Sequence, residues 1–129
     1  MNEEAIQILT SEPCASWLRK RWTPKLGDWI FDHDTQHVFL YNGDLQREAT
    51  YMDLNISWLP RVEDFISKNG LLKQAGATVF IFDLDERFGF NLECHAGLFT
   101  RRIFDADDIL LACAKALQWL LENREASDE

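Results

Sequence analysis

The stretch that decides the fold covers residues 105–123 and reads DADDILLACAKALQWLLEN. Its leading aspartates suit a helix N-terminus, where carboxylates cap free backbone N–H groups and complement the helix dipole. Over residues 109–121 the apolar residues are interrupted only by Lys115 and Gln118. We therefore predict a helix over residues 106–122 that is buried on more than one side, because its apolar residues extend beyond one helical face.

Within this helix, Leu111 and Trp119 lie towards the polar side that holds Lys115, Gln118 and Glu122. One sheet face does not account for this much apolar surface. We therefore predict a homodimer, with Leu111 and Trp119 in the contact. The alternative is that an N-terminal helix of the same chain covers these residues.

The length of 129 residues fits one domain that spans 1–129, with 123–129 expected to be a frayed acidic tail. The apolar fraction of 47% indicates a folded globular chain. No apolar run approaches the roughly 20 residues that a membrane span needs. The first residues, MNEE, do not have the basic start of a secretory signal, so we expect cytoplasmic localisation.

The net charge bears on which partners the chain can bind, and the cysteine content bears on whether it has disulfides. The chain has 13 Lys and Arg against 22 Asp and Glu, a formal net charge of −9. Such an acidic protein repels phosphate backbones, which argues against general nucleic-acid binding and permits an acidic DNA-mimic inhibitor as an alternative. The three cysteines, Cys14, Cys94 and Cys113, are far apart and are expected to be buried thiols rather than a disulfide framework.

Capping and hydrophobic patterns place the other helices. Residues 2–9 have a helix-forming composition. A second helix is expected from Ser11 as the N-cap to about Arg21, before Thr23-Pro24 ends it. A third is expected over residues 58–69, with Ser57 as its cap, because Ser-Trp-Leu-Pro resembles a helix entry.

The sequence pattern predicts two β-hairpins. Residues 28–31 and 37–41 are rich in β-branched and aromatic residues around a polar turn, and residues 49–56 offer a short third strand. Residues 78–82 and 88–94 predict the second hairpin, followed by a strand over 98–104. In its second arm, Phe90 and Leu92 should face the core, while Asn91 and Glu93 face away.

The densest group of possible catalytic or metal-binding side chains is Asp32, His33, Asp34 and His37. Carboxylates and imidazoles suit a metal-assisted hydrolase. However, strand alternation separates His33 from the two aspartates, and turns favour Asp for conformational reasons. We therefore expect a polar turn here and predict no metal site, no cofactor and no catalytic residue.

Two further groups have simpler structural explanations. The run Asp83-Leu84-Asp85-Glu86 has the carboxylates of a cation loop without the glycine and distal Glu of an EF-hand, so we expect a hairpin turn. Neighbours on a strand face opposite sides, so Cys94 and His95 should not act as a nucleophile and its base.

The segment from Trp17 to Trp22 reads WLRKRW and combines two tryptophans with three basic residues. Such a combination occurs in single-strand nucleic-acid binding, but we favour tryptophans that anchor a terminal helix on the core with solvated basic residues around them. We include Trp17 and Arg21 with Leu111 and Trp119 as candidate residues of a partner or oligomer interface.

Short motifs also connect this chain with known proteins. WTPKLGDW at residues 22–29, SWLPR at 57–61 and the Ala- and Leu-rich helix that follows Asp107 resemble small uncharacterised proteins of bacteriophages and prophages. The resemblance implies an accessory protein of bacterial or phage origin with packed helices and a sheet. It implies no activity and no catalytic residue.

These observations predict an α+β fold, a two-layer or three-layer sandwich of a mainly antiparallel sheet with two or three packed helices. The predicted function is that of a non-enzymatic interaction protein, which binds itself or another protein. The alternatives are the metal-assisted hydrolase at residues 32–37 and the DNA-mimic inhibitor.

Overall fold

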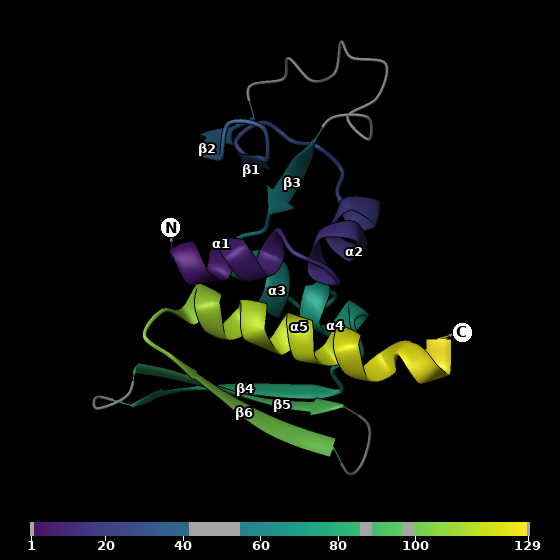
Figure 1. Ribbon diagram of the computed structural model, residues 1–129. Helices are drawn as coiled ribbons and strands as arrows, with labels where there is room; N and C mark the ends of the chain where they lie inside the picture. Colours follow the sequence, from purple (N-terminus) through teal and green to yellow (C-terminus); the bar gives the residue numbers. More distant parts are fainter. Residues whose placement is uncertain (1, 42–54, 86–88, 97–99, 129) are drawn as a thin grey trace.

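The computed structural model describes residues 2–41, 55–85, 89–96 and 100–128, without the side chains of 79–85, 89–90, 100 and 124–128 (Figure 1). This part of the chain contains five helices and six strands, which confirms the predicted α+β fold. The helices are α1 (Glu3–Leu9), α2 (Cys14–Arg21), α3 (Val62–Ile66), α4 (Leu71–Gln74) and α5 (Ile109–Asp128). The strands are β1 (Trp29–Asp32), β2 (His37–Leu40), β3 (Ile56–Leu59), β4 (Val79–Asp85), β5 (Gly89–Ala96) and β6 (Thr100–Ala106).

The strands form two antiparallel sheets of three strands each, in the orders β2-β1-β3 and β4-β5-β6. Both predicted hairpins are present, as β1–β2 and as β4–β5. The prediction of one continuous sheet was wrong. The strand β3 pairs with β1, and the helices lie between the two sheets (Figure 1).

The helix α5 occupies the centre of the molecule. One side packs on β5 and β6, and the other side contacts α1, α3 and α4 (Figure 1). Its residues from Leu110 to Ala114 are all buried, so no polar side exists in this turn. A helix that is apolar all round is stable in water only when it is covered all round, and this arrangement covers it.

Local chemistry fixes the start of α5 as predicted. The Asp108 carboxylate accepts a hydrogen bond of 3.0 Å from the backbone N–H of Leu110. The far end differs from the prediction, because α5 continues to Asp128. Most of the segment expected to fray therefore belongs to the helix.

The helix predicted over 58–69 begins later than expected. Residues 56–59 form β3, and Ser57 pairs with Phe31 across the sheet instead of capping a helix. The short helix α3 starts at Val62, where the Asp64 carboxylate accepts a 2.8 Å hydrogen bond from the backbone N–H of Arg61. The apolar residues around Ser57 explain the difference, because they suit a strand between two packed layers. The strand predicted over 49–56 falls mostly on residues outside the described ranges.

The first sheet separates a large core from a small one. Leu59 belongs to the main core, and Trp29 and Phe31 pack against it. On the opposite face, Ile30 and Ile56 form a second core with Trp22 and Tyr41. Because side chains alternate along β1, Trp29 and Phe31 point towards α1. A groove lies between these two side chains and the helix.

Candidate functional site

A groove of about 1000 Å³ lies between α1 and the first sheet. Its sheet side is formed by Trp29, Phe31 and Val38, which present aromatic and aliphatic surface. Its helix side and its ends are mainly polar. They are lined by Glu3, Ile6, Gln7, Thr10, Ser11, His33 and Gln36. An apolar floor with a few polar groups is the usual composition of a binding site. We call this feature the α1 groove.

His33 is one of the residues that line the α1 groove. Its Nε2 lies 2.7 Å from the Oγ of Ser57, and its ring meets Phe31 edge-on with centroids 5.1 Å apart. Its backbone N–H donates to the carbonyl of Asn55 at 3.0 Å. Two strands and an aromatic neighbour therefore hold the imidazole in place. The sequence indicated His33 as a candidate, but Ser57 was missed because its motif suggested a helix cap.

The His33 and Ser57 pair has the two groups of a nucleophile and its base, but little else of such a site. Ser57 is only 6% exposed. Among the described residues, no carboxylate hydrogen-bonds to the second ring nitrogen of His33, which would orient the imidazole. The pair is therefore better suited to supplying a fixed polar group at the groove than to attacking a substrate.

The remaining residues of the predicted cluster do not join His33. The Asp32 carboxylate accepts a 2.9 Å hydrogen bond from the backbone N–H of Asp34, and the Asp34 carboxylate accepts one of 3.0 Å from Asn55. His37 is exposed on β2 and is the cross-strand neighbour of Asp32. The Asp32 carboxylate thus has its partner within the turn, and the Asp34 carboxylate has its partner in the segment before β3. The polar turn predicted between the two strands is confirmed. In the described ranges, no three His, Cys, Asp or Glu side chains gather into a possible metal site.

All three cysteines are buried, as predicted. Burial raises the pKa of Cys14 to about 12, helped by the charges of Glu122 and Glu12. Burial also raises the pKa of Cys94 to about 11. For Cys113, burial followed by the charge of Asp108 raises the pKa to about 12. These thiols stay protonated at neutral pH, so none of them has the thiolate character of a nucleophile.

Two of the predicted interface residues are not on the surface. Leu111 is 6% exposed and Trp119 is 9% exposed within a single chain. The helix α1 packs on α5, and the Trp119 ring packs against Phe104 with centroids 5.7 Å apart. The prediction that this helix leaves Leu111 and Trp119 uncovered is therefore wrong. The homodimer itself stays a prediction that needs another surface.

The other two predicted interface residues do reach the surface. Trp17 is partly buried and Arg21 is exposed on α2. The Arg21 guanidinium lies 3.8 Å from the centre of the Trp17 ring, and it also donates to the Trp17 carbonyl at 3.3 Å. One turn of helix brings the two side chains together. Arg21 thus lies at the surface of α2, whereas Trp17 also packs against the main core, and neither residue lines the α1 groove.

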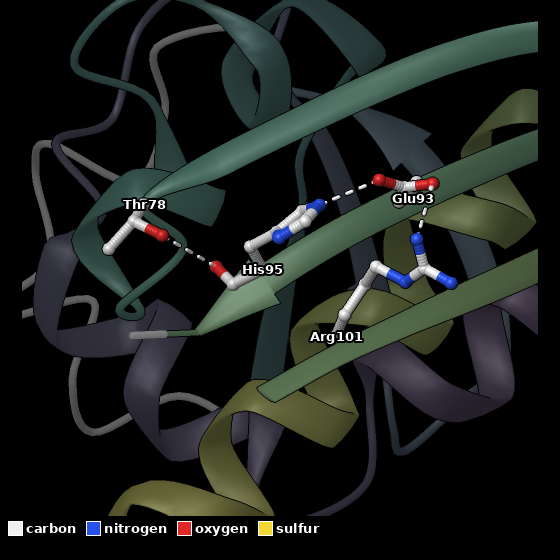
Figure 2. A network of polar contacts seen from close by, with 4 residues as sticks. All are labelled: Thr78, Glu93, His95 and Arg101. Atoms are coloured by element: carbon white, nitrogen blue, oxygen red, sulfur yellow. Dashed lines mark hydrogen bonds and ion pairs between the residues drawn. The ribbon is translucent and has the colours of Figure 1, made fainter. Parts of the chain in front are cut away.

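A second polar group lies on the outer face of the second sheet (Figure 2). The Nε2 of His95 is 2.6 Å from the Glu93 carboxylate, and Arg101 on β6 reaches the same carboxylate at 3.9 Å. The Thr78 hydroxyl donates to the carbonyl of His95 at 3.2 Å. Figure 2 shows Glu93 and His95 on the middle strand with Arg101 beside them.

The outer face follows from the predicted alternation of β5. Leu92 and Cys94 are fully buried, while Glu93 and His95 are only partly buried. The side chain of Phe90 lies outside the described residues. The turn predicted at residues 83–86 was placed too early, because residues 83–85 belong to β4 and Asp85 pairs with Gly89. Cys94 and His95 face opposite sides of the sheet, as the strand alternation predicted.

Comparisons with protein-family models, with curated proteins and with solved structures found no match to this chain. The resemblance to bacteriophage and prophage proteins therefore stays a prediction. None of the described helices combines the length and the apolar composition that a membrane crossing requires.

Proposed function

We propose that this protein is a non-enzymatic accessory protein that works through protein–protein contacts, and that the α1 groove receives an extended segment of a partner protein. The observation that carries the proposal is the position of the groove beside the edge strand β2, whose outer edge pairs with no described strand. The strand β2 is at the end of its sheet, and Val38 of β2 lines the groove. The resemblance to phage and prophage proteins supports an accessory role.

Strand addition explains how such a segment would bind. An extended chain placed beside β2 gains main-chain hydrogen bonds, and every second side chain points to the same face. Val38 and Leu40 are the cross-strand neighbours of Phe31 and Trp29, so they share the groove face. The inward side chains of an added strand would extend this row. Leu40 is 48% exposed, so it offers apolar surface for that contact.

The negative charge of the chain indicates which kind of partner segment would bind. Glu3 lies on the rim of the α1 groove, and the whole chain has a formal net charge of −9. A partner segment with alternating apolar residues and flanking Lys or Arg is therefore favoured over an acidic one. His33 and Gln36 add hydrogen-bonding groups to the groove.

A random-peptide display library tests the proposal without knowledge of the natural partner. We expect the immobilised protein to select peptides with alternating apolar residues and basic flanks. Titration calorimetry of a selected peptide should show Val38→Glu binding about tenfold more weakly or worse, because removing an unpaired carboxylate from water costs more than the roughly 1.4 kcal/mol that corresponds to tenfold in affinity.

The matched control is Leu26→Glu, which places the same charge on an exposed apolar residue that does not line the α1 groove. Its peptide affinity should equal that of the unmodified protein. A selection that yields no peptide, or a peptide that binds Val38→Glu as tightly as the original protein, would overturn the proposed groove function.

A further inference from the structure

The strand β6 lies at the edge of its sheet, and its exposed side chains are arranged symmetrically about Ile103. It is seven residues long and stands at the end of the second sheet, and no described strand pairs with its outer edge. Ile103 in its middle is 49% exposed. Two residues before it stands the exposed Arg101, and two residues after it the exposed Asp105. The strand therefore has opposite charges at equal distances from an exposed apolar residue.

We propose that β6 pairs antiparallel with β6 of a second copy of this chain, around a two-fold axis at Ile103. The two Ile103 side chains then face each other. Arg101 stands opposite Asp105 of the partner subunit, and the symmetry repeats this pair. Opposite charges across an antiparallel pair stabilise it, and a contact that complements itself closes as a dimer.

The charges select this register over its neighbours. An axis at Arg101 or at Arg102 would place two arginines opposite each other, which destabilises a strand pair. An axis at Phe104 would set the apolar Ile103 against Asp105 of the partner subunit. Only the axis at Ile103 matches both the apolar residue and the two charges.

The surface formed by α1 and α5 next to β6 is compatible with the same contact. A second groove of about 630 Å³ runs between α1, α5 and β6. Trp119 and Phe104 line it beside Arg102, Lys115, Glu4 and Glu122. The charged side chains that line this groove include two basic and two acidic residues. Two copies brought side by side would therefore not repel each other as two surfaces of one charge would. The joined sheets would have six strands, with the helices of both copies on one face.

This dimer goes beyond the proposed partner binding, because β6 belongs to the second sheet and the α1 groove to the first. The two ideas therefore fail separately. It also replaces the predicted contact through Leu111 with one that uses exposed residues.

Disulfide capture tests the register directly. Residues that face each other in an antiparallel pair have Cα atoms about 4.5–5.5 Å apart. A disulfide needs about 4.4–6.8 Å. We expect Ile103→Cys to give a disulfide-linked dimer under mild oxidation. The native thiols should not compete, because all three are buried.

Arg101→Cys is the matched control on the same strand. In the proposed register the two copies of residue 101 are about 14 Å apart, four residues along the strand, so they should not link. Mixing Arg101→Cys with Asp105→Cys should restore the link between unlike chains. Equal linking of Ile103→Cys and Arg101→Cys would overturn the register.

A charge exchange, followed by mass measurement in solution, tests the contact without cysteines. Arg101→Asp and Asp105→Arg each place like charges opposite each other twice, and we expect each to raise the dimer dissociation constant about tenfold. The combined variant restores both pairs and should recover the dimer. Lys73→Asp, an equal charge change on α4, should leave it unchanged. A chain that stays monomeric across micromolar concentrations would overturn the proposal.

Discussion

Both faces of the β2-β1-β3 sheet contact other described parts of the chain, whereas in the β4-β5-β6 sheet one face packs on α5 and the other holds polar and exposed residues. In the first sheet, Phe31 packs against the main core and Ile30 against the second core. In the second sheet, Leu92 is buried while its neighbour Glu93 pairs with His95 at the surface. The difference separates two roles. Burial on both sides fixes the position of the α1 groove, whereas the second sheet keeps one face at the surface.

The central helix gives the largest expected effect. Leu111 is 6% exposed in the main core. We predict that Leu111→Glu prevents folding, because an unpaired carboxylate in the core costs several kcal/mol and total stability is roughly 5–15 kcal/mol. Circular dichroism should show no cooperative unfolding transition. The exposed Glu122→Ala should change stability by about half a kcal/mol or less. A folded Leu111→Glu protein that has only lost its dimer would restore the interface first predicted from the sequence.

The two faces of β5 give the next effect. Leu92 is fully buried, and its truncation to alanine should cost about 2–5 kcal/mol through lost transfer energy and the remaining cavity. Glu93→Ala should cost about half a kcal/mol, because its ion pairs lie at the surface. Thermal melts of the two variants compare the faces directly. The same reasoning predicts a large loss for Phe90→Ala from the alternation of the sequence. If Glu93→Ala were the more damaging change, the outer face would have a structural or functional role that its exposure does not suggest.

These contrasts show what could be predicted from the sequence. The hairpins and the start of α5 depend on neighbouring residues, such as Asp108 and the alternation around Leu92, so local patterns were sufficient. The division into two sheets depends on β3 pairing with β1 across a long separation, which no local pattern specifies. Ser57 was assigned to a helix because its motif suits a cap, and the tertiary contacts of β3 override that preference.

The site was less predictable than the fold. His33 could be selected from its residue type, and the engagement of Asp32 and Asp34 in a turn followed from turn chemistry. The α1 groove could not be predicted, since it exists only because α1 lies over Trp29 and Phe31. The exposure of Leu111 was predicted wrongly for the same reason, because α1 packs against the side of α5 that was expected to be open.

The burial of Cys94 on the covered face of the second sheet should make the stability of the protein depend on pH. Burial raises the pKa of Cys94 from 9.0 to about 11 in the folded protein. The unfolded chain therefore releases this proton at a lower pH than the folded one does. The stabilisation is complete below about pH 9 and is lost as the pH rises towards 11. In urea titrations, Cys94→Ala should lower the slope of this loss by about 1.4 kcal/mol per pH unit. Equal slopes would mean that the Cys94 thiol is accessible to solvent in the native state.

The smallest expected effect compares the two histidine pairs. Ser57 is 6% exposed and lies 2.7 Å from His33, so Ser57→Ala removes a hydrogen bond at a closed site. We expect a loss of about 1 kcal/mol, because the partly buried imidazole then regains only some of its hydration. His95 pairs with Glu93 on the open face, where water can replace the lost partner. His95→Ala should therefore cost a few tenths of a kcal/mol at neutral pH. Urea titrations of both variants at pH 7 decide the order. A larger loss for His95→Ala would reverse the comparison between the sheets and would show that the open face contributes more stability than the groove.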